Sequence, residues 1–194
     1  MLPRMDINGV SAIVTGGASG IGAAAARQLA ERGAIVVVAD LQEEKGAALA
    51  EEIGGAFVKV DVTKTDDIVN AVEMAKSIGP VRVLVNSAGI GWAQRTVGKD
   101  GTYDSAANLD AFKRVIAINL VGSFDCIRIV GTAMSTTEPM EFGERGAIVI
   151  QLVLVRLLHR VQANAGAGKD TGIGDAAGKP GRTGERRSGG SGAR

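Results

Sequence analysis

The chain has 194 residues, of which 45% are apolar and 22% are charged, and its formal net charge at pH 7 is +1. This length favours a single domain, and the balance of apolar and charged residues is that of a globular protein. The small net charge provides no field that would attract nucleic acid or an anionic membrane, and the single cysteine, Cys126, excludes both an internal disulfide and a cysteine-based zinc site.

Apolar runs alternate with helical stretches along the chain, which is typical of βαβ units and a parallel sheet. The runs expected to be strands are Ser11–Thr15, Ile35–Ala39, Phe57–Val60, Val81–Val85 and Ala147–Val155. The stretches expected to be helices are Ile21–Arg32, Glu43–Glu52, Asp66–Ser77 and Leu109–Met134. We therefore predict an α/β fold, a Rossmann-like, doubly wound parallel sheet that is truncated after about five strands.

The composition changes after the fifth expected strand. The segment Gln162–Arg194 is rich in glycine, holds one large aliphatic residue, Ile173, and has no aromatic residue. Such a segment buries too little apolar surface to offset its chain entropy. We expect a dinucleotide-binding domain over residues 1–155 and an irregular or disordered, glycine-rich tail over residues 156–194. A basic arm for nucleic acid is the alternative for the tail, but its charges are dispersed and no aromatic side chain stands between them.

The N-terminal residues and the lengths of the apolar runs indicate where in the cell the protein is expected. Pro3, Arg4 and Asp6 interrupt the start of the chain, so no secretory signal is expected. No run of about 18 apolar residues occurs, so no membrane span is expected. With one cysteine, these observations favour a reducing compartment, and the expected location is the cytoplasm.

A glycine-rich turn lies between the first expected strand and the first expected helix, with the sequence Thr15-Gly16-Gly17-Ala18-Ser19-Gly20-Ile21-Gly22. Gly16 permits a sharp turn, Gly20 permits close approach to a pyrophosphate, and Gly22 permits close packing of helix and strand. Ser19 and Ile21 lie where the helix begins, so its free N–H groups and positive dipole end would face the phosphates. A turn without a ligand is the alternative, but the strand before it and the helix after it favour a dinucleotide.

Asp40 follows the second expected strand, 24 residues after Gly16. A carboxylate at this place accepts hydrogen bonds from the ribose hydroxyls of an adenosine. It would also repel a 2′-phosphate, and the glycine loop contains no Arg or Lys to offset that repulsion. The predicted cofactor is therefore NAD rather than NADP. The alternative roles for Asp40 are a solvated residue at the strand end and the N-cap of the next helix.

Four motifs resemble those of the short-chain dehydrogenase/reductase family. Thr15–Gly22 is similar to the family's TGxxxGxG motif, Asp61-Val62 to the aspartate after its third strand, Asn86-Ser87-Ala88-Gly89 to its NNAG motif, and Asn119 to its helix asparagine. The stretches between Ser123 and Val149 resemble the type-2 3-hydroxyacyl-CoA dehydrogenase subfamily. The resemblance covers residues 7 to about 149 and implies an oxidoreductase that moves a hydride between NAD and a secondary alcohol or ketone, such as a 3-hydroxyacyl-CoA. It implies no metal, a small-molecule substrate, and a dimer or tetramer that uses the helix Leu109–Met134.

The resemblance also implies a role for each matched residue. Adenine contacts are implied for Asp61 and Val62, and contacts along the cofactor channel for Ala88 and Gly89. Asn86 would stabilise the sheet beside the cofactor ribose. Asn119 would hold a water linked to the catalytic lysine, through its side chain and a local helix distortion. The alternatives are that Asn86 serves only as a turn residue and that Asn119 is bonded to its own helix.

The family's catalytic serine, tyrosine and lysine do not occur where the motif register places them. Those positions hold Val153, Gly166 and Asp170, no Tyr-x-x-x-Lys occurs, and the only tyrosine is Tyr103. The tyrosine would exchange the proton during hydride transfer and the lysine would lower its pKa, so we expect this chain to be inactive as written. The alternatives for its function are a non-catalytic NAD-binding module and a non-functional truncated product. A shift of reading frame near codon 150 is our hypothesis for the mismatch, which resequencing of the coding DNA tests.

Overall fold

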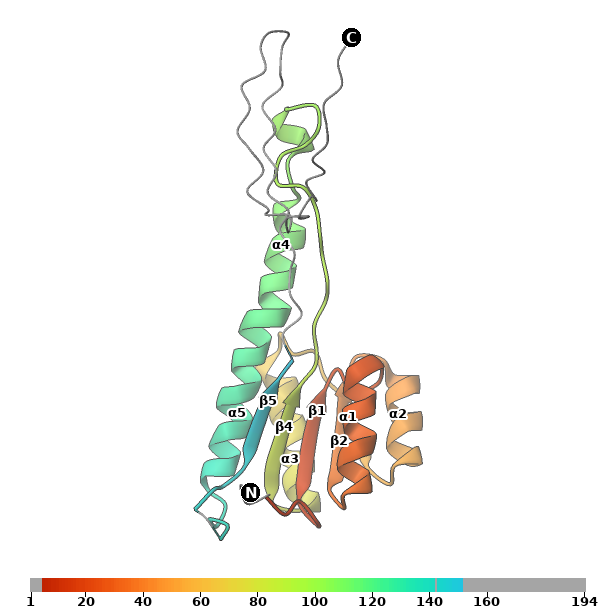
Figure 1. Cartoon of the computed structure of the whole chain (residues 1–194), viewed down its shortest axis with the longest axis vertical. Coiled ribbons are helices and arrows are strands. Elements are labelled where there is room, and N and C mark those ends of the chain that lie inside the picture. The colour runs from red at the N-terminus through yellow and green to blue at the C-terminus, as the bar shows by residue number, and fades with distance from the viewer. Residues whose placement is uncertain (1–4, 142, 152–194) are drawn as a thin grey trace, which may run out of the picture. The chain divides into compact units, whose positions relative to one another are not determined.

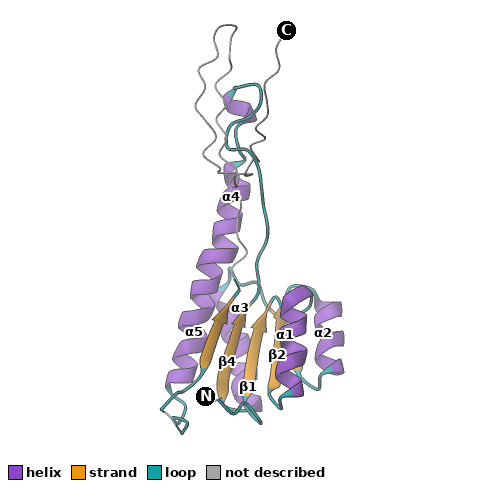
Figure 2. Cartoon of the chain, in the orientation of Figure 1, coloured by secondary structure: helices purple, strands orange, loops and turns teal. Residues whose placement is uncertain are grey.

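The computed structural model describes residues 5–141 and 143–151. The strands are β1 (Ser11–Thr15), β2 (Ile35–Asp40), β3 (Ala56–Lys59), β4 (Val81–Asn86) and β5 (Ala147–Ile150). The helices are α1 (Gly20–Glu31), α2 (Glu43–Glu52), α3 (Thr65–Ile78), the short 3-10 helix η1 (Tyr103–Ser105), α4 (Leu109–Ile116), the π-helical η2 (Ala117–Gly122) and α5 (Ser123–Ser135). The strands form one parallel sheet in the order β3-β2-β1-β4-β5 (Figures 1 and 2). The predicted Rossmann-like α/β fold is confirmed.

Helices pack on both faces of the sheet around β1, β2 and β4, which explains why the central residues of these strands are mostly apolar. Ile13 and Val37 point into a layer formed with α3 and α5, whereas Val14 and Val38 point into a layer formed with α1 and α2. The chain places β2 and β3 on one side of β1, and β4 and β5 on the other (Figure 1). This reversal leaves a crevice beyond the carboxyl ends of β1 and β4, where open α/β sheets bind their ligands.

The predicted helix Leu109–Met134 is present, but its hydrogen-bond pattern changes midway. α4 leads into the π-helical η2, and α5 follows without a break in the chain's helical course. A π-helical turn holds an extra residue and is frequent at functional sites. Composition does not mark this turn, because one added residue leaves it almost unchanged.

The helical stretch Tyr103–Ser135 contains an 18-residue window with a mean hydropathy of 1.5, so it is long and apolar enough to cross a membrane by length and composition. Asp125 and Arg128 interrupt the apolar run in this stretch, which is why the sequence alone predicts no membrane span here. In the structure, α5 packs into the core of the domain through Cys126, Val130, Ala133 and Met134. Only 22% of that window is buried, so packing into the core accounts for part of its apolar character.

β5 forms one edge of the described sheet and is held there by a buried arginine of β4. Arg82 donates hydrogen bonds from its guanidinium group to Thr137 Oγ1 and to the carbonyl oxygens of Glu138 and Arg145. These charge-assisted bonds fix the segment that leads from α5 into β5. All four residues of β5 are exposed, so Ala147–Ile150 forms an exposed apolar edge of the described sheet.

Several predictions concern residues outside the described part of the chain. They are the continuation of the fifth strand to Val155, the tail over residues 156–194, and the catalytic positions Val153, Gly166 and Asp170.

Cys126 gives a direct test of the packing of α5. The side chain is fully buried, and burial raises the pKa of its thiol to about 12. The thiolate is the reactive form, so the native protein at about pH 8 should not react with Ellman's reagent, whereas the protein in concentrated guanidinium chloride should react quickly. Rapid reaction of the native protein would show that α5 does not cover the sheet.

Candidate functional site

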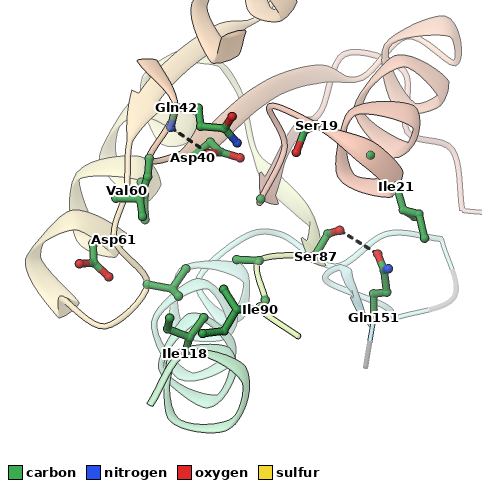
Figure 3. Close-up of a pocket in the computed structure, with 16 residues that line it drawn as sticks. Ser19, Ile21, Asp40, Gln42, Val60, Asp61, Ser87, Ile90, Ile118 and Gln151 are labelled. Atoms are coloured by element: carbon green, nitrogen blue, oxygen red, sulfur yellow. Dashed lines mark hydrogen bonds between the residues drawn. The ribbon is translucent and has the colours of Figure 1, made fainter. Parts of the chain in front are cut away.

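A cavity of about 500 Å³ opens at the carboxyl edge of the sheet (Figure 3). Every strand contributes to its wall through residues at or just beyond its end. These residues are Gly16 and Ser19–Ile21 after β1, Asp40–Gln42 at β2, Val60–Val62 after β3, Ser87–Ile90 after β4, Gln151 after β5, and Ile118 from η2. The cavity therefore lies at the crevice that the strand order creates. Within the described residues, no group of three His, Cys, Asp or Glu side chains is arranged to hold a metal ion.

The glycine loop brings three backbone segments into close contact. Gly16 has a φ of 64°, and a Cβ at this position would lie 2.7 Å from the Cα of Ala88. Gly20 has a φ of 55° and open space beyond it, which leaves room for ligand atoms against its backbone. Gly22 is buried, and a Cβ there would collide with the carbonyl oxygen of Gly16. Gly16 and Gly20 line the cavity, whereas Gly22 does not line it but packs against Gly16.

The first turn of α1 borders the cavity. Ser19 is the N-cap of α1, and its side chain makes no capping hydrogen bond. Ser19, Gly20 and Ile21 all line the cavity, so the backbone N–H groups at the positive end of the helix dipole border it. Such a helix start is a binding site for phosphate groups.

Asp40 joins the glycine loop to the end of β2. Its Oδ2 accepts a hydrogen bond from the backbone N–H of Ala18 at 3.0 Å, and its Oδ1 accepts one from Gln42 N–H at 2.9 Å (Figure 3). The residue is 8% exposed and α2 is capped by Gln42, so Asp40 is neither a solvated residue nor a helix cap. A carboxylate has about four acceptor positions, and the two backbone bonds leave capacity for two hydroxyl donors in the cavity.

Asp61 and Val62 form the wall beyond β3. Asp61 Oδ1 accepts hydrogen bonds from Thr63 Oγ1 at 2.7 Å and from Thr63 N–H at 3.0 Å. These bonds hold the pKa of the Asp61 carboxyl below its ordinary value, which keeps it an ionised acceptor. Val62 is buried against Gly122 of η2, where a Cβ would lie 2.8 Å from Val62 Cγ2. The end of η2 therefore supports this wall.

Two asparagines predicted as site residues stand behind the cavity rather than on its wall. Asn86 accepts a hydrogen bond from Thr15 Oγ1 at 3.4 Å and donates one from Nδ2 to the carbonyl of Ser123 at 3.1 Å, which links β1 to α5. Asn119 Oδ1 accepts from Ile90 N–H, and its Nδ2 donates to Ile90 O, each at 2.9 Å. The expected helix distortion at Asn119 is present as η2. Its side chain holds the wall residue Ile90 rather than bonding to its own helix, and one lone pair of Oδ1 and one N–H of Nδ2 remain for the water contact that the resemblance implies.

The structure adds wall residues that were not candidates from the sequence. They are Leu41, Gln42, Val60, Ser87, Ile90, Ile118 and Gln151. Leu41, Gln42 and Val60 adjoin the predicted aspartates, so their position at a strand end was an available signal. Ile118 and Gln151 had no such signal, because the first depends on η2 and the second on where β5 ends.

Comparison with known proteins agrees with this geometry. The family model for short chain dehydrogenase matches residues 11–152. A 3-hydroxyacyl-CoA dehydrogenase type-2 of Drosophila melanogaster is 44% identical over 145 residues, covering 73% of this chain and 56% of that protein. Its Homo sapiens counterpart is 40% identical over 148 residues, covering 74% of this chain and 56% of that protein.

A solved structure also matches this chain over about three quarters of its length. The crystal structure of 3-hydroxyacyl-CoA dehydrogenase type-2 from Mycobacterium avium matches with a TM-score of 0.69 and 43% identity, covering 73% of this chain and 55% of that one. This chain thus spans a little over half the length of the relatives it matches. The family match and the glycine-loop geometry lead to one conclusion: the chain belongs to the short-chain dehydrogenase family.

Proposed function

We propose that the described domain binds NAD in the cavity at the carboxyl edge of the sheet. The adenosine ribose would lie at Asp40, the adenine between Asp61 and Val62, and the pyrophosphate at the start of α1. The observation that carries the proposal is the bond from Ala18 N–H to Asp40, because it fixes a charged acceptor against the same turn that offers amides to the phosphates.

The charges around the cavity favour NAD over NADP. Asp40 and Asp61 are the charged residues on the described wall, and no Lys or Arg lines it. A 2′-phosphate would meet the Asp40 carboxylate without a cation to offset the repulsion. Free ribose hydroxyls would instead donate to that carboxylate.

Bound NAD would supply a hydride acceptor for the oxidation of a secondary alcohol. Membership of the family supports an oxidoreductase lineage, and similarity to type-2 3-hydroxyacyl-CoA dehydrogenases supports a hydroxyacyl substrate for that lineage. Tyr103, the only tyrosine, lies in η1, is 99% exposed and does not line the cavity. We therefore propose that this chain binds NAD without turning over such a substrate.

The exposed face of the long helix supports self-association, as the resemblance implied. Leu120, Val121 and Phe124 are 63%, 56% and 63% exposed. They lie within five residues of one another, on either side of the junction of η2 and α5. Clustered apolar side chains of this kind mark contact surfaces, so we propose a dimer or tetramer that uses this helix.

Replacing Asp40 tests the cofactor choice. The Asp40→Ala variant loses a charged acceptor for the ribose, and a hydrogen bond to a charged group contributes about 1.5–3 kcal/mol. The preference for NAD over NADP, measured as the ratio of their Kd values by calorimetry, should therefore shrink by about tenfold or more. Protection of Cys126 reports whether the variant is folded. A folded variant with an unchanged preference would contradict the assignment of Asp40.

Replacing Gly22 tests the packing behind the cavity. The Cβ of Gly22→Ala meets the carbonyl oxygen of Gly16, and overpacking of this kind costs about 1–3 kcal/mol. Calorimetry should show NAD affinity reduced by about tenfold or more, and the Tm should fall. The control is Gly131→Ala in α5, where the nearest atom to the new Cβ is Ile148 Cδ1 at 3.8 Å. The control should bind NAD normally, and wild-type affinity in both variants would refute the packing argument.

A turnover assay tests whether the chain is non-catalytic. The full chain with NAD and a 3-hydroxyacyl-CoA should produce NADH no faster than a reaction without protein, while calorimetry of the same sample detects NAD binding. Formation of NADH well above that background would refute the proposal. Recovery of the chain only as insoluble aggregate would favour the non-functional product, to which the exposed apolar edge of β5 is relevant.

A further inference from the structure

A side-chain hydrogen bond borders the cavity at the end away from Asp40 and Asp61 (Figure 3). Ser87 Oγ donates to Gln151 Oε1 at 2.7 Å, and both residues line the cavity. Ser87 follows β4 and Gln151 follows β5, so the bond joins the ends of two adjacent parallel strands.

The strand order assigns this end of the cavity to one half of a dinucleotide. Asp40 ends β2 and Asp61 follows β3, both on one side of β1, whereas Ser87 and Gln151 follow the strands on the other side. The glycine loop after β1 lies between these two groups. Because a pyrophosphate joins the two nucleosides, an adenosine above β2 and β3 directs the second nucleoside toward β4 and β5.

The hydrogen bond from Ser87 also determines which atoms of the Gln151 amide can bind a ligand. The amide oxygen of Gln151 accepts from Ser87, which leaves the two N–H donors of Nε2 for another partner. No described residue accepts a hydrogen bond from this nitrogen. A nicotinamide riboside presents ribose oxygens and a carboxamide oxygen, all of which are acceptors. A side chain held in place before the ligand arrives loses less conformational entropy when it binds.

We propose that Gln151 donates a hydrogen bond to the nicotinamide-riboside half of NAD and that Ser87 is the positioning residue that holds its amide. This inference rests on the proposed NAD site. A purely structural tie between β4 and β5 is the competing explanation for the pair. The main chain already provides that tie, because Gln151 N–H donates to Asn86 O at 2.8 Å and extends the ladder between the two strands.

The test compares two ligands on the full chain. AMP carries the adenosine half alone, whereas NAD carries both halves. In Gln151→Ala and in Ser87→Ala, calorimetry should give a Kd for NAD raised about three- to tenfold, as expected for one lost hydrogen bond, and a Kd for AMP unchanged within about twofold. Ser135→Ala is the matched control, because this hydroxyl bonds Thr132 O at the end of α5 and lies outside the cavity wall; both affinities should stay at their wild-type values.

The variant Gln151→Glu distinguishes a hydrogen bond donated by Gln151 to NAD from a purely structural link between β4 and β5. In Gln151→Glu, a carboxylate oxygen still accepts from Ser87, but the N–H donors are gone. Donation by Gln151 predicts that this variant binds NAD at least as weakly as Gln151→Ala, with AMP affinity unchanged.

The outcomes separate this inference from the proposed function. Wild-type NAD affinity in Gln151→Glu, or in both alanine variants, would overturn the inference and leave the NAD site standing. A wild-type chain that is folded by the Cys126 assay and binds neither AMP nor NAD would overturn the proposed function and the inference with it.

Discussion

At Gly16 the backbone of the β1–α1 turn touches the loop that follows β4, at a separation that no side chain would allow. The other features of the cavity follow from this contact. Gly22 packs α1 onto the same turn, and the bond from Ala18 N–H to Asp40 brings the end of β2 against it. The ends of three different strands are thereby brought together by contacts that the main chain of this turn makes. The site is consequently sensitive to the addition of a single methyl group in the turn, although it contains few long polar side chains.

The long helical stretch supports the cavity from a different direction. Its π-helical turn places Asn119 against the backbone of Ile90 and Gly122 against Val62, which are wall residues after β4 and after β3. Since both contacts depend on the extra residue in the turn, the helix distortion and the shape of the cavity are coupled. A regular α-helix over the same residues would shift one of these contacts away from the wall.

The sequence was sufficient to predict the fold and the centre of the site, but not its margins. Strands appeared as short apolar runs because helices cover both faces of the sheet, and Gly16 and Asp40 were identifiable because their roles depend on spacing from strand ends. The bond from Asn119 to Ile90 was not predictable, because it depends on a helical turn that composition does not reveal. Gln151 was missed for another reason: the apolar run resumes at Leu152 and continues to Val155, so one polar residue within it does not mark where β5 ends.

A crystal structure of the full chain with NAD tests the central claim most directly. We predict that the hydroxyls of the adenosine ribose lie within hydrogen-bond distance of the Asp40 carboxylate, and that the pyrophosphate oxygens lie against the backbone amides of Gly20 and Ile21. NAD bound with its adenosine away from Asp40, or with its pyrophosphate away from the start of α1, would contradict it.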